Sequence, residues 1–141
     1  MLQMLIPIFI VVGSNTIYHI CAKSLPPSVN SFASLAISYG VAALCSLALF
    51  FLTAEQKHLP AEILKANWTS YALGAAIVGL EFGYICVYRA GWKISVGNLV
   101  ASLCLACVLL FVGLLLYKEA LSLRQIIGIG VCMLGLTLVA K

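Results

Sequence analysis

One acidic side chain, Glu81, lies near the middle of a long apolar segment, residues 68–92. A charged carboxylate at the centre of a membrane-spanning helix costs about 2.5–3.5 kcal/mol on insertion scales, so an acid at this depth is a candidate functional group. At about 100° per residue, Tyr84, Tyr88 and Trp92 share its face of the predicted helix. Aromatic faces attract cations, and a carboxylate binds either a proton or a cation. The spacing therefore predicts a cation- and proton-binding face on this segment.

A structural role for Glu81 is the alternative. The acid could pair with Arg89 on the same face, or with His19 or Asn98 from other helices. Residues eight positions apart are about 12 Å apart along a helix axis, which is too far for easy pairing of Glu81 with Arg89. We therefore favour the functional hypothesis for Glu81.

Five more polar side chains in apolar segments are candidates for lining the same cavity. They are Asn15, Tyr18 and His19, within about one third of a helix circumference, and Asn98 and Ser102, which share a helix face. His19 could relay protons, or it could be a structural residue at the membrane interface, which is the interpretation that we favour. Asn15 and Asn98 could equally bond neighbouring helices.

The composition predicts an all-α integral membrane protein. Of the 141 residues, 64% are hydrophobic and 9% are charged, against about 25% charged in soluble domains. A helical span needs about 20 apolar residues. Five segments qualify, namely residues 2–22, 29–53, 68–92, 95–117 and 121–140. They leave very few residues for a soluble domain, so we expect one transmembrane domain over residues 1–141, with a short interfacial helix beginning at Pro60.

The basic residues are scattered singly, so the net charge of +4 does not indicate a nucleic-acid partner. With five spans, one side of the membrane carries Lys57, Lys65, Lys118 and Arg124, and the other carries Lys23, Arg89, Lys93 and Lys141. Lys and Arg in short loops set the orientation, and here the count is equal. Either copies insert both ways, or loop details determine one orientation.

All six cysteines lie in apolar segments, which argues against an extracellular disulfide framework. Cys104 and Cys107 have the spacing of a redox pair, but reactive pairs need a polar, partly exposed setting and these lie in a leucine-rich helix. The histidines and acids are too few and too dispersed for a metal site. We expect no cofactor, no metal and no nucleic acid.

Small residues lie where helices could pack closely. Gly79 and Gly83 lie on the face opposite Glu81, and Gly128, Cys132 and Gly135 form a stripe in the last segment. Such faces allow close approach of backbones. The stripe could contact a second copy or pack within the chain.

Several short motifs resemble the EamA domain of the drug/metabolite transporter superfamily. The match rests on Gly13-Ser14-Asn15 followed by Lys23, on Gly83-Tyr84 through Tyr88, on Ser95 to Leu103, and on the ending Leu116-Tyr-Lys-Glu119-Ala-Leu-Ser-Leu-Arg-Gln-Ile-Ile-Gly128 followed by Gly135. The chain lacks the proline that is common in the family's fourth span. The resemblance covers essentially the whole chain and implies a multi-pass protein of a bacterial or archaeal cell (inner) membrane.

The resemblance also implies an assembly. Family members usually carry two five-helix repeats, which lie in opposite orientations because five is odd. This chain has one repeat, so an oppositely inserted copy would complete the arrangement, as in the related small multidrug resistance proteins. A parallel pair or a heteromer with a half-length partner is the alternative.

Together these features predict a proton-coupled antiporter that exports cationic or amphipathic small molecules as a homodimer, with Glu81 of each protomer lining the cavity. No step requires covalent chemistry, so we expect no enzyme activity. The alternatives are a flippase for a lipid-linked metabolite and a non-transporting membrane subunit of a larger complex.

Overall fold

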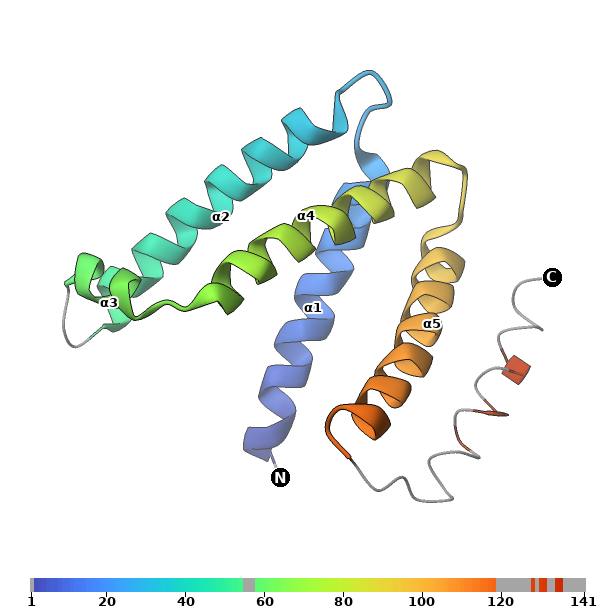
Figure 1. The fold of residues 1–141 in the computed structure, drawn as a ribbon. Helices are drawn as coiled ribbons and strands as arrows, with labels where there is room; N and C mark the ends of the chain where they lie inside the picture. The colour runs from blue at the N-terminus through green and yellow to red at the C-terminus, as the bar shows by residue number, and fades with distance from the viewer. Residues whose placement is uncertain (1, 55–57, 119–127, 129, 132–133, 136–141) are drawn as a thin grey trace. The chain divides into compact units, whose positions relative to one another are not determined.

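The computed structural model describes residues 2–54, 58–118, 128, 130, 131, 134 and 135. Within them the chain forms the helices α1 (Leu2–Ser24), α2 (Ser31–Thr53), α3 (Leu59–Lys65), α4 (Trp68–Arg89) and α5 (Ile94–Leu115), joined by short loops (Figure 1). Most of the predicted last span, residues 121–140, lies outside the described residues, and so does Cys132.

Four of these helices are long and apolar enough to cross a membrane: Leu5–Ser24, Ser31–Thr53, Trp68–Arg89 and Ile94–Leu115. At 1.5 Å per residue, 20 residues cover about 30 Å, which is the thickness of the hydrocarbon core. A helix satisfies its own backbone hydrogen bonds, and so a long apolar segment can lie in lipid. The predicted all-helical membrane architecture is confirmed for the first four spans.

The short helix predicted between the second and third spans is also present. α3 begins at Leu59, with Pro60 in its first turn. Proline is tolerated there because the first amide groups of a helix have no intrahelical acceptor. Near the end of α3, Lys65 and Glu62 form an exposed ion pair at 2.6 Å.

The third long helix ends earlier than predicted. α4 stops at Arg89, three residues before the expected end at Trp92. Gly91 has a φ of +93°, a conformation that glycine adopts without strain and that ends a helix. Trp92 therefore does not continue the helix face that carries Glu81, and this part of the sequence-based prediction is wrong.

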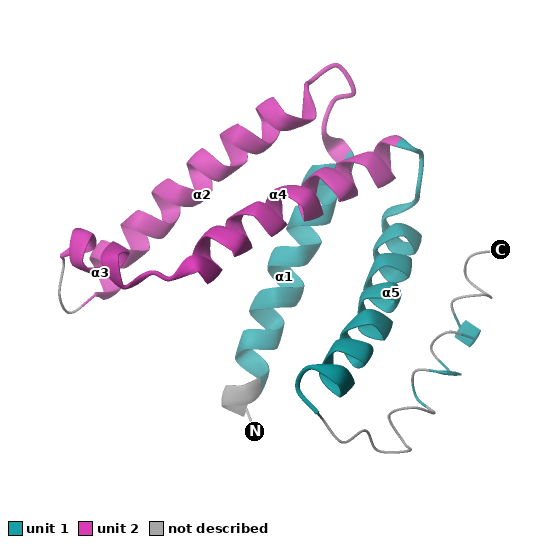
Figure 2. Ribbon diagram, viewed as in Figure 1, with its two compact units in different colours: residues 1–23, 90–141 teal, residues 24–89 magenta. Residues whose placement is uncertain are grey.

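The chain divides into two compact units, residues 1–23 with 90–141 and residues 24–89 (Figure 2). In the second unit α2 packs against α4 and runs in the opposite direction. The rings of Phe32 and Phe82 stack between the two helices, with centroids 4.7 Å apart. Leu35 and Ile85 are buried in the same unit. This pair of helices is the scaffold for Glu81.

Few large side chains are buried within the described part of the chain. Its buried apolar residues are Leu35, Ile85 and Tyr88, whereas Phe9 and Leu52 are more than 70% exposed. A soluble protein rarely exposes so continuous an apolar surface, and such surfaces mark contacts with lipid or protein. The exposed apolar helices are thus suited to a bilayer and to partner helices.

Asn30 caps the N-terminus of α2. Its Oδ1 accepts hydrogen bonds from the backbone N–H groups of Phe32 at 2.9 Å and Ala33 at 3.3 Å. We expect Asn30→Ala to lower the stability of the folded protein by about 1 kcal/mol, since two amide groups lose their acceptor. Thermal unfolding in detergent measures the loss, and Asn30→Ser, which keeps an acceptor, is the control. Equal destabilisation by both variants would contradict this account of the cap.

Candidate functional site

Glu81 lies on α4 and is half-buried. Its carboxyl group lies near the hydroxyl of Tyr39 on α2. The Tyr39 hydroxyl oxygen is buried and forms no hydrogen bond with any described residue. A neutral donor next to a carboxylate stabilises its charge without cancelling it. The charge of Glu81 therefore remains available to a ligand.

Two of the predicted aromatic residues lie together one and two turns from Glu81. The rings of Tyr84 and Tyr88 stack with centroids 6.1 Å apart and an angle of 23° between their planes. Tyr88 is only 4% exposed, whereas Tyr84 is half-buried. These rings provide an aromatic face next to the carboxylate on the same helix, and Trp92 lies beyond the end of that helix.

Arg89 is bound to the loop that precedes α2 rather than to Glu81. Its Nη1 donates to Ser31 Oγ at 2.8 Å, and its Nη2 donates to the backbone oxygens of Val29 at 2.6 Å and Pro26 at 3.4 Å. Both terminal nitrogens of the guanidinium thus have acceptors within residues 24–89. The ion pair between Arg89 and Glu81 that we considered as a structural alternative is not formed.

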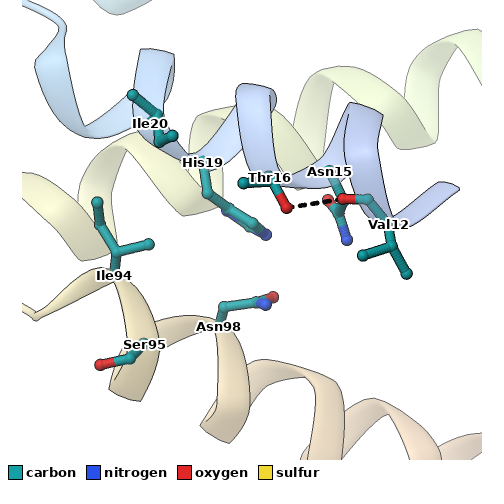
Figure 3. A pocket seen from close by; sticks show the side chains of 8 residues that line it. All are labelled: Val12, Asn15, Thr16, His19, Ile20, Ile94, Ser95 and Asn98. Carbon is teal, nitrogen blue, oxygen red and sulfur yellow. Dashed lines mark hydrogen bonds between the residues drawn. The ribbon is translucent and has the colours of Figure 1, made fainter. Parts of the chain in front are cut away.

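The other predicted polar residues gather in the first compact unit, around a pocket of about 290 Å³ between α1 and α5. Its lining residues are Val12, Asn15, Thr16, His19, Ile20, Ile94, Ser95 and Asn98 (Figure 3). Figure 3 shows the side chains of His19 and Asn98 pointing toward each other across this pocket. His19 is 4% exposed and interacts with the amide of Asn98.

Further contacts order this pocket. The Ser102 hydroxyl donates to Asn98 Oδ1 at 3.3 Å, as their predicted shared face requires. The Tyr18 ring meets the His19 ring edge to face at 5.0 Å, and Tyr18 lines a neighbouring hollow that also borders Asn15. At the C-terminal end of α1, Lys23 Nζ donates to the backbone oxygen of Trp92 at 2.8 Å.

The sequence analysis missed two residues of these clusters. Tyr39 lies among small residues of α2, and the sequence gives no sign that it lies near Glu81 in the fold. Thr16 borders the pocket of the first unit, and its hydroxyl donates to the Val12 backbone oxygen at 2.8 Å. Threonine often bonds back to the preceding turn in this way, so its hydroxyl is already satisfied.

The cysteine pair and the glycines predicted to pack closely are not packed tightly against other described residues. Cys104 is exposed and Cys107 is half-buried, and both are free thiols. A Cβ atom added at Gly79, Gly83, Gly128 or Gly135 would meet no described atom within 4 Å. Close packing on these glycines therefore remains a prediction.

The class of protein follows from these elements. Four helices that are able to span a bilayer, one of which carries a half-buried carboxyl group, define a multi-pass integral membrane protein. Residues 2–141 match the model of the EamA-like transporter family, so the chain belongs to that family, as its motifs predicted. Its members are membrane transporters of small solutes and not enzymes. No curated protein and no solved structure matches the chain.

Proposed function

We propose that this protein is a proton-coupled exporter of cationic or amphipathic small molecules that works as a dimer. The observation that carries the proposal is the Glu81 carboxyl group, which is half-buried on a membrane-spanning helix. An acid is rare at such depth because an uncompensated charge there is costly, so we expect Glu81 to have a function.

The mechanism is competition for one carboxylate. A cation that reaches Glu81 displaces a proton, and a proton that returns displaces the cation. Tyr84 and Tyr88 offer aromatic faces, which attract organic cations by about 0.5–2 kcal/mol. If the site opens alternately to the two sides of the membrane, this exchange couples export of the substrate to entry of protons.

The polar residues of the first unit are a separate part of the proposal. Asn15, His19 and Asn98 present hydrogen-bonding groups to a pocket that holds no carboxylate among its described lining residues. We propose that they bind polar groups of a solute. Tyr18 and Ser102 support them from the same two helices.

A dimer would complete the assembly. The family match covers residues 2–141 and so includes both compact units, which supports a single five-helix domain per chain. The equal numbers of basic residues on the two predicted sides of the membrane support pairing with an oppositely inserted copy, which gives the inverted repeats common in transporters. The proposed contacts between the two copies are Gly79, Gly83, Gly128 and Gly135, which have free space around them in the described part of the chain. Cys132, which lies between Gly128 and Gly135 in the sequence, is included in the proposed contact.

Proton release on ligand addition tests the proposal. Purified protein in weakly buffered detergent solution receives organic cations, amines or neutral amphiphiles, and the pH change is recorded. We expect cations to release protons from the wild type and not from Glu81→Gln. Glu62→Gln, which changes an exposed acid of α3, should release protons as the wild type does.

Two other outcomes would replace the proposal. Binding of neutral amphiphiles without proton release would favour the flippase. Co-purification of a stoichiometric partner with no ligand binding by the chain alone would favour the subunit.

A further inference from the structure

The pocket of the first unit, which we call the α1–α5 pocket, has hydrogen-bonding groups from both of its helices. Asn15 and His19 come from α1, and Asn98 comes from α5. Figure 3 shows the ends of these three side chains directed into the space between the helices. A few polar groups that converge on one pocket are typical of a small-molecule site, because they orient the ligand.

The volume of the α1–α5 pocket limits the size of its ligand. The pocket holds about 290 Å³, which is the lower end of the range for ligand pockets, about 300–1,000 Å³. Three of its lining residues, Val12, Ile20 and Ile94, are apolar. The pocket therefore fits a small solute that has an apolar part and a polar group.

The lining also selects the charge of the ligand. Among its described residues there is no Asp, Glu, Lys or Arg, and His19 is the one titratable side chain. An imidazole of ordinary pKa, about 6.5, is neutral at pH 8. Burial of an ion without a partner costs far more free energy than burial of a hydrogen-bonded neutral group. The α1–α5 pocket is thus suited to an uncharged polar solute.

Asn98 has a fixed orientation in this lining. The Ser102 hydroxyl, one turn further along α5, donates to Asn98 Oδ1 at 3.3 Å. This bond holds the plane of the amide, which carries an acceptor and a donor side by side. A carboxamide of this kind forms two hydrogen bonds with any edge that also has an acceptor next to a donor, as asparagine does with adenine. A carboxamide group on the ligand has such an edge.

From this arrangement we propose that the α1–α5 pocket binds a small uncharged solute through a carboxamide group. Asn98 pairs with that group, and Asn15 is a second polar contact from the opposite helix. The inference rests on the proposed function, in which this pocket binds polar groups of a solute, and it names the class of that solute. Glu81 is not among the described lining residues of the pocket and remains the proposed site of the cation.

The test uses nicotinamide, which is small, uncharged at pH 8 and carries one carboxamide. Its binding to the purified full chain in detergent is measured at that pH by equilibrium dialysis of the labelled compound. Two relatives with the same ring compete with it. Nicotinate carries a carboxylate in place of the carboxamide, and N,N-dimethylnicotinamide lacks the N–H donors. We expect each of them to bind about tenfold more weakly than nicotinamide, because the paired hydrogen bonds are lost.

Two variants test the residues of the pocket. Asn98→Leu nearly keeps the size of the side chain and removes its hydrogen bonds, so we expect nicotinamide to bind about tenfold more weakly. Asn15→Leu should weaken binding by a smaller factor, because Asn15 is exposed. Ser38→Leu is the control, since it places the same side chain at an exposed position of α2. It should bind nicotinamide as the wild type does.

Wild-type affinity in Asn98→Leu would overturn the inference. Equal or tighter binding of nicotinate would also overturn it, since the pocket would then take an anion, and so would the failure of nicotinamide to bind at millimolar concentration. The comparison of the three ligands uses the wild type alone, so it decides the inference even if a variant does not fold.

Glu81→Gln separates this inference from the proposed cation exchange. The variant should lose proton release on addition of cations and keep its affinity for nicotinamide. If nicotinamide does not bind while cations release protons from the wild type, the role of the pocket is overturned and the exchange stands. If nicotinamide binds through Asn98 while cations release no protons, the exchange is overturned and the role of the pocket stands.

Discussion

Glu81→Gln should reduce proton-driven transport to the rate of vesicles without protein. Glutamine has nearly the shape of glutamate, but it carries no charge and does not take up or release a proton near neutral pH. The variant therefore loses both ligands of the proposed exchange at once. Its helix still packs against α2, because the substitution leaves the stacked rings of Phe32 and Phe82 unchanged.

The measurement uses proteoliposomes with an imposed pH gradient and the compound class that releases protons from the wild type. Uptake is followed with the gradient in both directions, since an antiporter moves its substrate against the proton flow. Glu62→Gln is the control, because it removes an acid from the exposed helix α3 and only a surface ion pair with Lys65. Gradient-driven transport by Glu81→Gln at the wild-type rate would rule out the mechanism.

Arg89→Ala has the largest expected effect on stability. The guanidinium donates three hydrogen bonds to the segment around the start of α2, and alanine leaves those acceptors to solvent. Hydrogen bonds to charged groups contribute about 1.5–3 kcal/mol when well formed. Because Arg89 is exposed, we expect a total loss of about 1–3 kcal/mol.

Thermal unfolding in detergent measures this loss, and Arg89→Lys separates geometry from charge. Lysine keeps the charge but lacks the planar fork that reaches several acceptors, so it should recover only part of the stability. Lys65→Ala removes an exposed ion pair and should cost about 0–1 kcal/mol. Should Arg89→Ala unfold like the wild type, Arg89 would not hold the loop to α4.

The packing of α2 against α4 links these predictions. Arg89 of α4 binds Ser31 at the start of α2, and Glu81 lies eight residues earlier on α4. Loss of the Arg89 contacts should therefore also weaken cation binding, although Arg89 itself does not contact the proposed ligand. Glu81→Gln should show the reverse pattern, with binding lost and stability retained.

The amino-acid sequence by itself determined the membrane class, the first four spans and the one acid within them. This was possible because a bilayer demands about 20 apolar residues per helix, a requirement that is local and one-dimensional. The sharing of a face by Asn98 and Ser102 was also predictable, since it depends only on the period of one helix. The same period placed Tyr84 and Tyr88 together.

The partners of these residues were decided by the tertiary structure. Neither Tyr39 next to Glu81 nor Arg89 on the loop before α2 could be predicted, because the rotation and axial offset of one helix against another depend on packing along the whole contact. The end of α4 before Trp92 depends on the positive φ of Gly91, one glycine among 11 in the chain. Helical periodicity specifies which side chains share a face, and only packing between helices specifies what that face meets.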